Sequence, residues 1–155
     1  MDQEKLVFLT TGAFEKLNAL EENTKSNWGV MNAQQMVEHL ADFFDVSTEK
    51  IKTKFYTPEE HLPKYKEFLM SDKEFRENTK APADLLGEIP LPLRFASISE
   101  AKEHLKKSVN NFVEYFKEDR KTLHPVFGML NFDEWVRLHY KHVVHHLKQF
   151  KLLNG

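Results

Sequence analysis

The sequence contains 155 residues, of which 41% are hydrophobic and 30% are charged, an ordinary composition for one folded domain with one core. Its 22 basic residues do not exceed its 24 acidic ones, so the chain has no positive excess for a nucleic-acid backbone, and nucleic acid is not an expected partner. Because there is no cysteine, disulfides, thiolate metal ligands and cysteine nucleophiles are excluded, and any bound metal must be held by His, Asp or Glu.

The N-terminal sequence MDQEKLVFLTTGAFEKL has no basic region followed by a sustained apolar stretch. No later run approaches the roughly 18 apolar residues that a membrane-spanning helix needs. We therefore expect a cytoplasmic protein with no membrane partner, and we expect residues 1–155 to form a single helical domain.

Apolar residues at three- and four-residue steps predict four amphipathic helices. The first covers residues 3–22, and the second covers residues 33–52 with Asn32 as its N-cap. The segment from Thr53 to Ser97 holds five of the six prolines, so it is expected to be a long crossover with one short helix at residues 59–70.

The second half of the chain contributes the other two helices. Ser99 is a candidate N-cap for the third helix. The sequence HPVFG, residues 124–128, then predicts a tight connection, and Asn131 or Asp133 can cap a fourth helix that reaches about Leu153. The predicted fold class is all-α, a four-helix bundle with a long crossover between helices 2 and 3, which lets consecutive helices run parallel.

The fourth predicted helix carries three histidines on its apolar face. At about 100° per residue, His139, His142 and His146 project to the side of the core residues. The basic residues project to the opposite side: Arg137, Lys141, Lys148 and Lys151. Burying an imidazole without a partner costs roughly 1–3 kcal/mol, so three on one apolar stripe need a shared reason, and a metal ion is the simplest one. His142 and His146 are one turn apart, which lets both rings converge on one ion.

A third ligand has to come from another helix, and His39 in the second helix is the best candidate. It lies between Met36 and Phe43, at the edge of the apolar stripe, so it can instead be a boundary residue whose tip is in water. Similarly, His142 and His146 can be a hydrogen-bonded core pair without metal. The sequence leaves these alternatives open.

The remaining histidines give weaker signals. His145 is expected to support a ligand or to lie at the boundary of the core, and His139 is expected to support a ligand, contact substrate or simply pack. His124 opens the HPVFG turn, where it either shapes the loop or lies near the mouth of the site. Charged neighbours predict that the other two are solvated surface residues: His61 and His104.

Four other side chains have two interpretations each. Trp28 and Trp135 are expected to pack in the bundle, but their rings can also wall a pocket. Glu38 and Asp42 flank His39 and can orient its ring or relay protons, although surface charge is the simpler interpretation. None of the four is assigned a catalytic role.

Two stretches of the sequence resemble the DinB-like superfamily of metal-binding four-helix bundles. They are WGVMNAQQMVEHL, residues 28–40, and HPVFGMLNFDEWVRLHYKHVVHHLKQF, residues 124–150. The second is most similar to a branch of the superfamily with the ending HPxFG…HxxHHxxQF. The superfamily's histidine in the second helix is matched by His39, and its ending His-x-x-His-His-x-x-Gln is matched by His142, His145, His146 and Gln149.

The resemblance implies a divalent zinc, nickel or iron ion held by His39, His142 and His146, with positions left for water or substrate, as in catalytic rather than structural zinc sites. The residues that would surround the ligands or line the pocket are His139, His145, His124 and Gln149. Characterised relatives include transferases that act with low-molecular-weight thiols and a thiol-dependent isomerase. Many relatives have Arg-Gly where this chain has Leu147 and Lys148, so substrate recognition at that point is not carried over.

In the predicted enzyme, the ion would lower the pKa of a bound water or thiol to about 7 and so supply the nucleophile that a cysteine-free chain lacks. The expected reaction is transfer of a small thiol to an electrophile, or hydrolysis of that electrophile, by a metal-dependent S-transferase or hydrolase. The first alternative is a non-catalytic module that binds a metal or small ligand in the same cavity, alone or as a homodimer. The second is a structural bundle with a degenerate site, which the retention of three candidate ligands disfavours.

Overall fold

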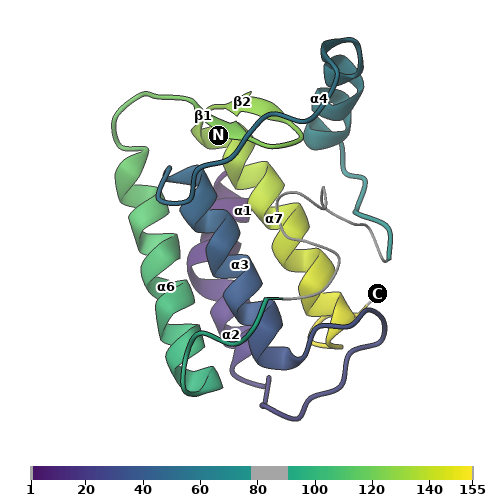
Figure 1. Cartoon of the computed structure of the whole chain (residues 1–155), viewed down its shortest axis with the longest axis vertical. Coiled ribbons are helices and arrows are strands. Elements are labelled where there is room, and N and C mark those ends of the chain that lie inside the picture. Colours follow the sequence, from purple (N-terminus) through teal and green to yellow (C-terminus); the bar gives the residue numbers. More distant parts are fainter. Residues whose placement is uncertain (1, 78–90, 155) are drawn as a thin grey trace.

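The computed structural model describes residues 2–77 and 91–154, and in these residues the chain is mainly helical with one small sheet (Figure 1). The longest helices are α3 (Ala33–Ser47), α6 (Ile98–Tyr115) and α7 (Phe132–Gln149). A further helical rod is built from three consecutive segments: α1 (Gln3–Val7), the π-helical turn η1 (Phe8–Gly12) and α2 (Ala13–Leu17). The shorter elements are the 3-10 turn η2 (Glu59–His61), helix α4 (Leu62–Met70) and the strands β1 (Thr122–His124) and β2 (Gly128–Leu130).

Side-chain caps set the first residues of the long helices, because the first amides of a helix need acceptors from outside it. Asn32 caps α3, as predicted. The cap of α6 is Ser97 and not Ser99, so this helix begins two residues earlier than expected. Of the two candidates for α7, Asn131 is the cap and Asp133 lies inside the first turn.

The first rod, α3 and α7 end earlier than predicted. The rod ends at Leu17 instead of residue 22, α3 ends at Ser47 instead of residue 52, and α7 ends at Gln149 instead of residue 153. Two residues beyond each of the last two ends, the backbone has a positive φ that a right-handed helix cannot include: 65° at Glu49 and 64° at Lys151. Apolar periodicity continues through these turns, which is why the sequence pattern does not mark them.

The HPVFG stretch forms a hairpin, which the sequence pattern did not predict because each strand has only three residues. β1 and β2 are antiparallel, with Thr122 opposite Leu130 and His124 opposite Gly128. Thr122 ties the hairpin to both central helices: its Oγ1 donates to the carbonyl of Ser47 on α3 and accepts from Trp135 Nε1 on α7, each at 2.8 Å. The hairpin therefore fixes the ends of α3 and α7 against each other.

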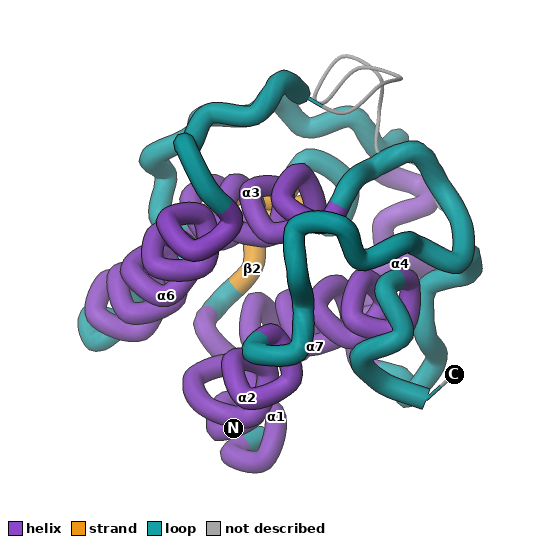
Figure 2. The backbone as a smooth tube through the Cα atoms, turned by 90° about the horizontal axis from the view of Figure 1, so that it is seen from below, coloured by secondary structure: helices purple, strands orange, loops and turns teal. Residues whose placement is uncertain are grey.

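The helices pack around a shared apolar core (Figures 1 and 2). Helix α3 contacts both α6 and α7, the first rod contacts α7 and α6, and α4 lies on the outside of α7. The largest fully buried side chains include Trp135, Phe44 and Phe112, and the rings of Phe44 and Phe112 pack against each other between α3 and α6. No helix in the described part of the chain combines the length and the apolar character that crossing a membrane requires.

The segment between α3 and α6 was predicted as a long crossover with a short helix at residues 59–70. This helix is present as η2 followed directly by α4. Residues 71–77 continue along α7, and residues 91–97 return along α3. The part of the predicted crossover at residues 78–90 lies outside the described residues.

We expect Asn131→Ala to lower the free energy of unfolding by about 1 kcal/mol, because Asn131 Oδ1 accepts from the backbone N–H of Glu134 at 2.9 Å. Urea denaturation measures the change. Asn110→Ala is the matched control, since Asn110 is exposed in the interior of α6, where alanine is the better helix former. Equal losses of stability in both variants would argue against a capping role for Asn131.

Candidate metal centre

Three histidine side chains from two helices meet at one point of the α3–α7 interface. His39 comes from α3, and His142 and His146 come from consecutive turns of α7. His142 Nε2 lies 2.9 Å from His39 Nε2 and 3.2 Å from His146 Nε2. One ring nitrogen from each residue lies within 4.8 Å of the other two, an arrangement that could hold a metal ion. The sequence prediction that these three residues come together is confirmed.

The separations of the nitrogens suit a common metal ion. For metal–nitrogen bonds of about 2.0–2.1 Å, two ligand nitrogens are about 2.9 Å apart at a right angle and about 3.3 Å apart at a tetrahedral angle. The observed distances of 2.9 and 3.2 Å fall within this range. Taken as whole residues, His146 is buried, whereas His39 and His142 are partly exposed.

Gln149 determines which ring nitrogen of His146 carries the hydrogen. Its Nε2 donates to the carbonyl of Trp28 at 3.0 Å, so its Oε1 is the atom that faces His146 Nδ1 at 2.7 Å. An amide oxygen only accepts, and therefore Nδ1 of His146 carries the proton and Nε2 presents a lone pair. This is the tautomer that a metal-binding imidazole needs.

The three Nε2 atoms cannot all be satisfied by the hydrogens of neutral rings. His142 Nε2 faces both other Nε2 atoms, yet a neutral imidazole has at most one hydrogen there and can direct it to only one of them. With the lone pair of His146 fixed by Gln149, at least one of the two nitrogen pairs makes no hydrogen bond. A cation at their common point would accept a lone pair from all three nitrogens. The three residues therefore fit a metal ion.

Burial keeps these rings neutral. It lowers the pKa of His39 to about 4, with smaller contributions from the charges of His145 and Arg94. Burial is also the main cause that holds the pKa of His142 and that of His146 well below the ordinary value, and neighbouring histidines add to it. Neutral imidazole is the form that donates a lone pair to a metal, so the site is ready to bind one at neutral pH.

An aromatic ring packs against two of the three histidines. Phe43 on α3 packs edge-on against His39 and His142, with ring centroids 5.3 and 5.0 Å apart. Its other neighbour is His124, whose ring lies 5.9 Å away. Phe43 was not predicted as part of the site, although its position one turn after His39 was a usable signal in the sequence.

His124 shapes the hairpin loop, which confirms one of its two predicted roles. Its Nδ1 accepts from the backbone N–H groups of Val126 and Phe127, at 3.0 and 3.2 Å. Burial lowers its pKa to about 3, so the ring stays neutral. His124 contacts Phe43 and not the three candidate ligands, so it supports the site through that ring.

His139 is a packed histidine. Its ring is stacked between Phe44 and Trp135, at centroid distances of 3.8 and 5.1 Å, and packs against the edge of Phe112. It lies outside the cluster of converging nitrogens, and its buried Nε2 has no hydrogen-bond partner among the described residues. Of the three roles left open by the sequence, packing is the one that these contacts support.

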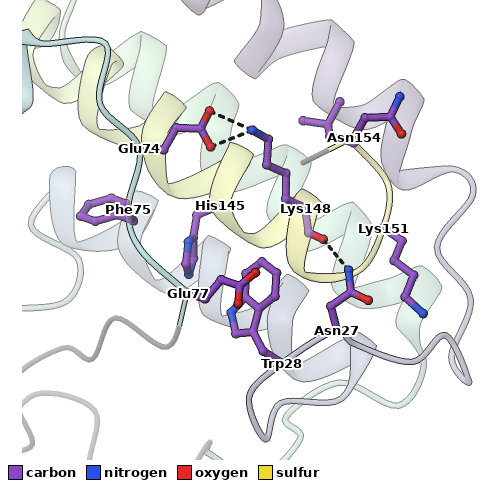
Figure 3. Close-up of a pocket in the computed structure, with 10 residues that line it drawn as sticks. Asn27, Trp28, Glu74, Phe75, Glu77, His145, Lys148, Lys151 and Asn154 are labelled. Atoms are coloured by element: carbon purple, nitrogen blue, oxygen red, sulfur yellow. Dashed lines mark hydrogen bonds and ion pairs between the residues drawn. The ribbon is translucent and has the colours of Figure 1, made fainter.

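His145 is buried and separates His146 from a neighbouring pocket. The His145 and His146 ring centroids are 4.9 Å apart, and Trp28 and Phe75 pack on the other sides of His145. The pocket has a volume of about 380 Å³, and Figure 3 shows His145 pointing into it beside Phe75 and Trp28. Acidic and basic side chains both line it: Glu74 and Glu77, and Lys148 and Lys151 at the end of α7 and just beyond it. Trp28 thus walls a pocket, whereas Trp135 packs in the core.

Glu38 and Asp42 are buried, so the simpler interpretation of them as surface charges is wrong. Both face Arg94, which lies near the end of the long crossover: Arg94 donates to the two carboxylate oxygens of Asp42 at 2.9 Å each, and its backbone N–H donates to Glu38. Gln34 donates to Glu38 at 2.9 Å and to the carbonyl of Phe95 at 2.8 Å. This polar stripe beside His39 holds residues 94–95 on α3, and its spacing of four residues was a sequence signal that we did not use.

Three other predictions about charged or polar residues can be compared with the structure. His61 is exposed, as predicted. His104 is only partly exposed, because it stacks on Phe95 and lies 3.6 Å from Asp45. Lys141 is buried instead of facing solvent, because its Nζ donates to the carbonyls of Ser71 and Lys73 where the crossover follows α4.

A family model of the DinB superfamily matches residues 9–150 of the chain. The matched range includes all three converging histidines, Gln149 and the polar stripe of α3. Comparison with curated proteins and with solved structures gave no match.

We expect the metal-free protein to lose stability as the pH falls below about 6.5. The buried histidines stay neutral in the folded state down to a pH of about 4 for His39 and about 3 for His124, but they take up protons near pH 6.5 once unfolded. The unfolded state then binds more protons, and each buried histidine lowers the free energy of unfolding by up to about 1.4 kcal/mol per pH unit.

Urea denaturation measures how the free energy of unfolding changes across this window, at four pH values about one unit apart: 7.5, 6.5, 5.5 and 4.5. His61→Gln is the control, because His61 is exposed and its loss should leave the slope unchanged. A free energy of unfolding that stays constant from pH 7.5 to 5 would contradict the burial of neutral rings.

We also expect His139→Phe to leave metal affinity within about twofold of wild type and to leave stability unchanged or raised. Removing an unpartnered buried nitrogen recovers up to about 1–3 kcal/mol, and an aromatic ring preserves the stack. Calorimetric zinc titration and thermal unfolding test this, with His142→Phe as the comparison that should lose metal binding. Loss of zinc affinity in His139→Phe would make His139 part of the metal centre.

Proposed function

We propose that this chain, which belongs to the DinB superfamily, uses His39, His142 and His146 to hold a divalent metal ion in a catalytic centre. The observation that carries the proposal is the convergence of three Nε2 atoms, with the tautomer of His146 set by Gln149. Zinc, nickel and iron all accept imidazole ligands. Three protein ligands leave positions for water or substrate, which is typical of catalytic centres.

Such an ion would act as a Lewis acid and make a water or thiol a strong nucleophile at neutral pH. The chain supplies three neutral imidazoles to hold it, and Gln149 keeps the ring of His146 in a fixed orientation. Phe43 covers one side of the His39 and His142 rings, and the partial exposure of these two residues supports an approach for the reactants.

The reaction that we propose is transfer of a low-molecular-weight thiol to a small electrophile, or hydrolysis of that electrophile. In the transfer, the thiol sulfur forms a bond to an electrophilic carbon while the bond to the leaving group breaks, and the thiol proton is released to solvent. The thiol comes from solution because the chain has no cysteine. The pocket next to His145 is large enough to take the body of one reactant.

The superfamily match and the helical structure also support the finer fold proposal. In it, the first rod, α3, α6 and α7 are the four helices of a bundle, and residues 48–97 are the long crossover between its second and third helices. Helix α3 contacts α6 and α7, and the first rod contacts the same two helices. A bundle requires these contacts.

A non-catalytic binding module is the second candidate. It is favoured by one observation: none of the three candidate ligands lines the pocket beside His145, so a ligand there need not reach the metal. In this case the centre would bind a metal or a small molecule without turnover.

Removing two candidate ligands should abolish metal binding. We expect the double variant His142→Ala with His146→Ala to remain folded and to show no zinc binding in calorimetric titration, because a single histidine cannot hold the ion. The matched control removes two histidines that lie away from the centre, His61→Ala with His104→Ala, and should bind zinc as the wild type does. Wild-type affinity in the first variant would place any bound ion elsewhere.

Catalysis should depend on the metal. We expect the metal-loaded protein to accelerate reaction of small thiols, or water, with activated halides or epoxides, and we expect chelator treatment to remove the effect. His39→Ala should lose at least the roughly 10-fold typical of a disturbed metal centre. If the metal-loaded protein, the chelator-treated protein and His39→Ala gave equal rates with all of these thiols and electrophiles, the result would favour the binding module over the enzyme.

A further inference from the structure

A short loop before α3 crosses the end of α7 and is hydrogen-bonded to two residues there. The side-chain Nδ2 of Asn27 donates to the Lys148 carbonyl at 3.5 Å, and the other two bonds involve Gln149. The backbone N–H of Asn27 donates to the Gln149 carbonyl at 2.7 Å. In return, the side-chain Nε2 of Gln149 donates to the carbonyl of Trp28 at 3.0 Å. The next residue, Gly29, has a φ of +82°, in the left-handed region that residues with a side chain rarely adopt. The loop thus reaches Gln149 in a conformation that favours glycine.

Gly29 also leaves the space that the Gln149 amide occupies. A Cβ atom at position 29 would lie 2.7 Å from Gln149 Nε2, which is too close for any real contact. Gln149 is buried, and the other end of the same amide accepts from His146 Nδ1 at 2.7 Å. A shift of the amide away from position 29 therefore alters both of its hydrogen bonds.

We propose that Gly29 is a positioning residue of the metal centre and acts through Gln149. The absence of a side chain at position 29 lets the Gln149 amide bridge the Trp28 carbonyl and His146 Nδ1, and this bridge fixes the tautomer in which His146 Nε2 points toward His39 and His142. The inference rests on the proposed metal centre but not on catalysis. Gly29 touches neither the metal nor a reactant.

A side chain at position 29 would displace either the Gln149 amide or the loop, and both displacements have the same effect on His146. If the amide moves, His146 Nδ1 loses its acceptor; if the loop moves, Gln149 Nε2 loses the Trp28 carbonyl and the amide is free to rotate. In either case His146 is no longer held in one tautomer. Loss of such support around a metal ligand typically weakens metal binding about 10- to 100-fold.

The variant that tests this is Gly29→Ala, and the chain offers a matched control in Gly128→Ala. Gly128 has nearly the same φ, +79°, but a Cβ there would meet only apolar atoms of Leu62 and Phe55 at ordinary distances. Both variants should therefore lose thermal stability from backbone strain. Only Gly29→Ala should lose zinc affinity, by at least about 10-fold in calorimetric titration. Gly29→Asn, which eases the strain but keeps the Cβ, should lose zinc affinity as well.

Two further measurements separate positioning from a general loss of structure. In a Gln149→Met background, Gly29→Ala should cause no additional loss of zinc affinity, because the amide through which it acts is gone. In the metal-free protein, nitrogen NMR of the imidazole rings should show His146 protonated at Nδ1 in wild type and in Gly128→Ala, and a mixture of tautomers in Gly29→Ala.

Wild-type zinc affinity in Gly29→Ala, an equal loss in Gly128→Ala, or a full additional loss in the Gln149→Met background would each overturn the proposal. A wild-type protein that binds no zinc would overturn both the metal centre and this inference. A protein that binds zinc and responds to Gly29→Ala as described, but shows no turnover, would remove only the proposed enzyme activity.

Discussion

The structure around the candidate metal centre depends on three imidazole nitrogens that face one another across the α3–α7 interface. Neutral rings cannot form a hydrogen bond across every gap between these nitrogens, and burial opposes their protonation. The arrangement is thus unfavourable by itself and favourable around a cation. This is a physical reason for His39 to lie opposite two consecutive turns of α7.

The rest of the described structure holds α3 and α7 in the alignment that this meeting point needs. At one end, Thr122 of the hairpin bonds to Ser47 of α3 and to Trp135 of α7. At the other end, the loop before α3 is bonded to Gln149 of α7. Two separate cross-links between the same helices resist sliding, so the ring nitrogens stay within bonding distance of one ion.

Two signals in the sequence predicted the converging histidines. Helical periodicity put His142 and His146 on the face of Trp135, and the family resemblance matched His39, which lies at the edge of its own apolar stripe. The sequence did not predict the hairpin or the burial of Glu38 and Asp42. Those features depend on Thr122 and Arg94, whose partners are 75 and 52 residues away in the chain. Patterns within a single helix carry no information about such partners.

The central claim is that one divalent ion is bound by three imidazoles. X-ray absorption spectroscopy of protein produced without a polyhistidine tag tests it most directly, because the spectrum identifies the metal and its ligands together. The account predicts about one divalent ion per chain with three imidazole nitrogens at about 2.0–2.1 Å and one or more oxygen or sulfur ligands in the remaining positions. A metal-free protein, or a bound ion with an all-oxygen shell, would contradict it.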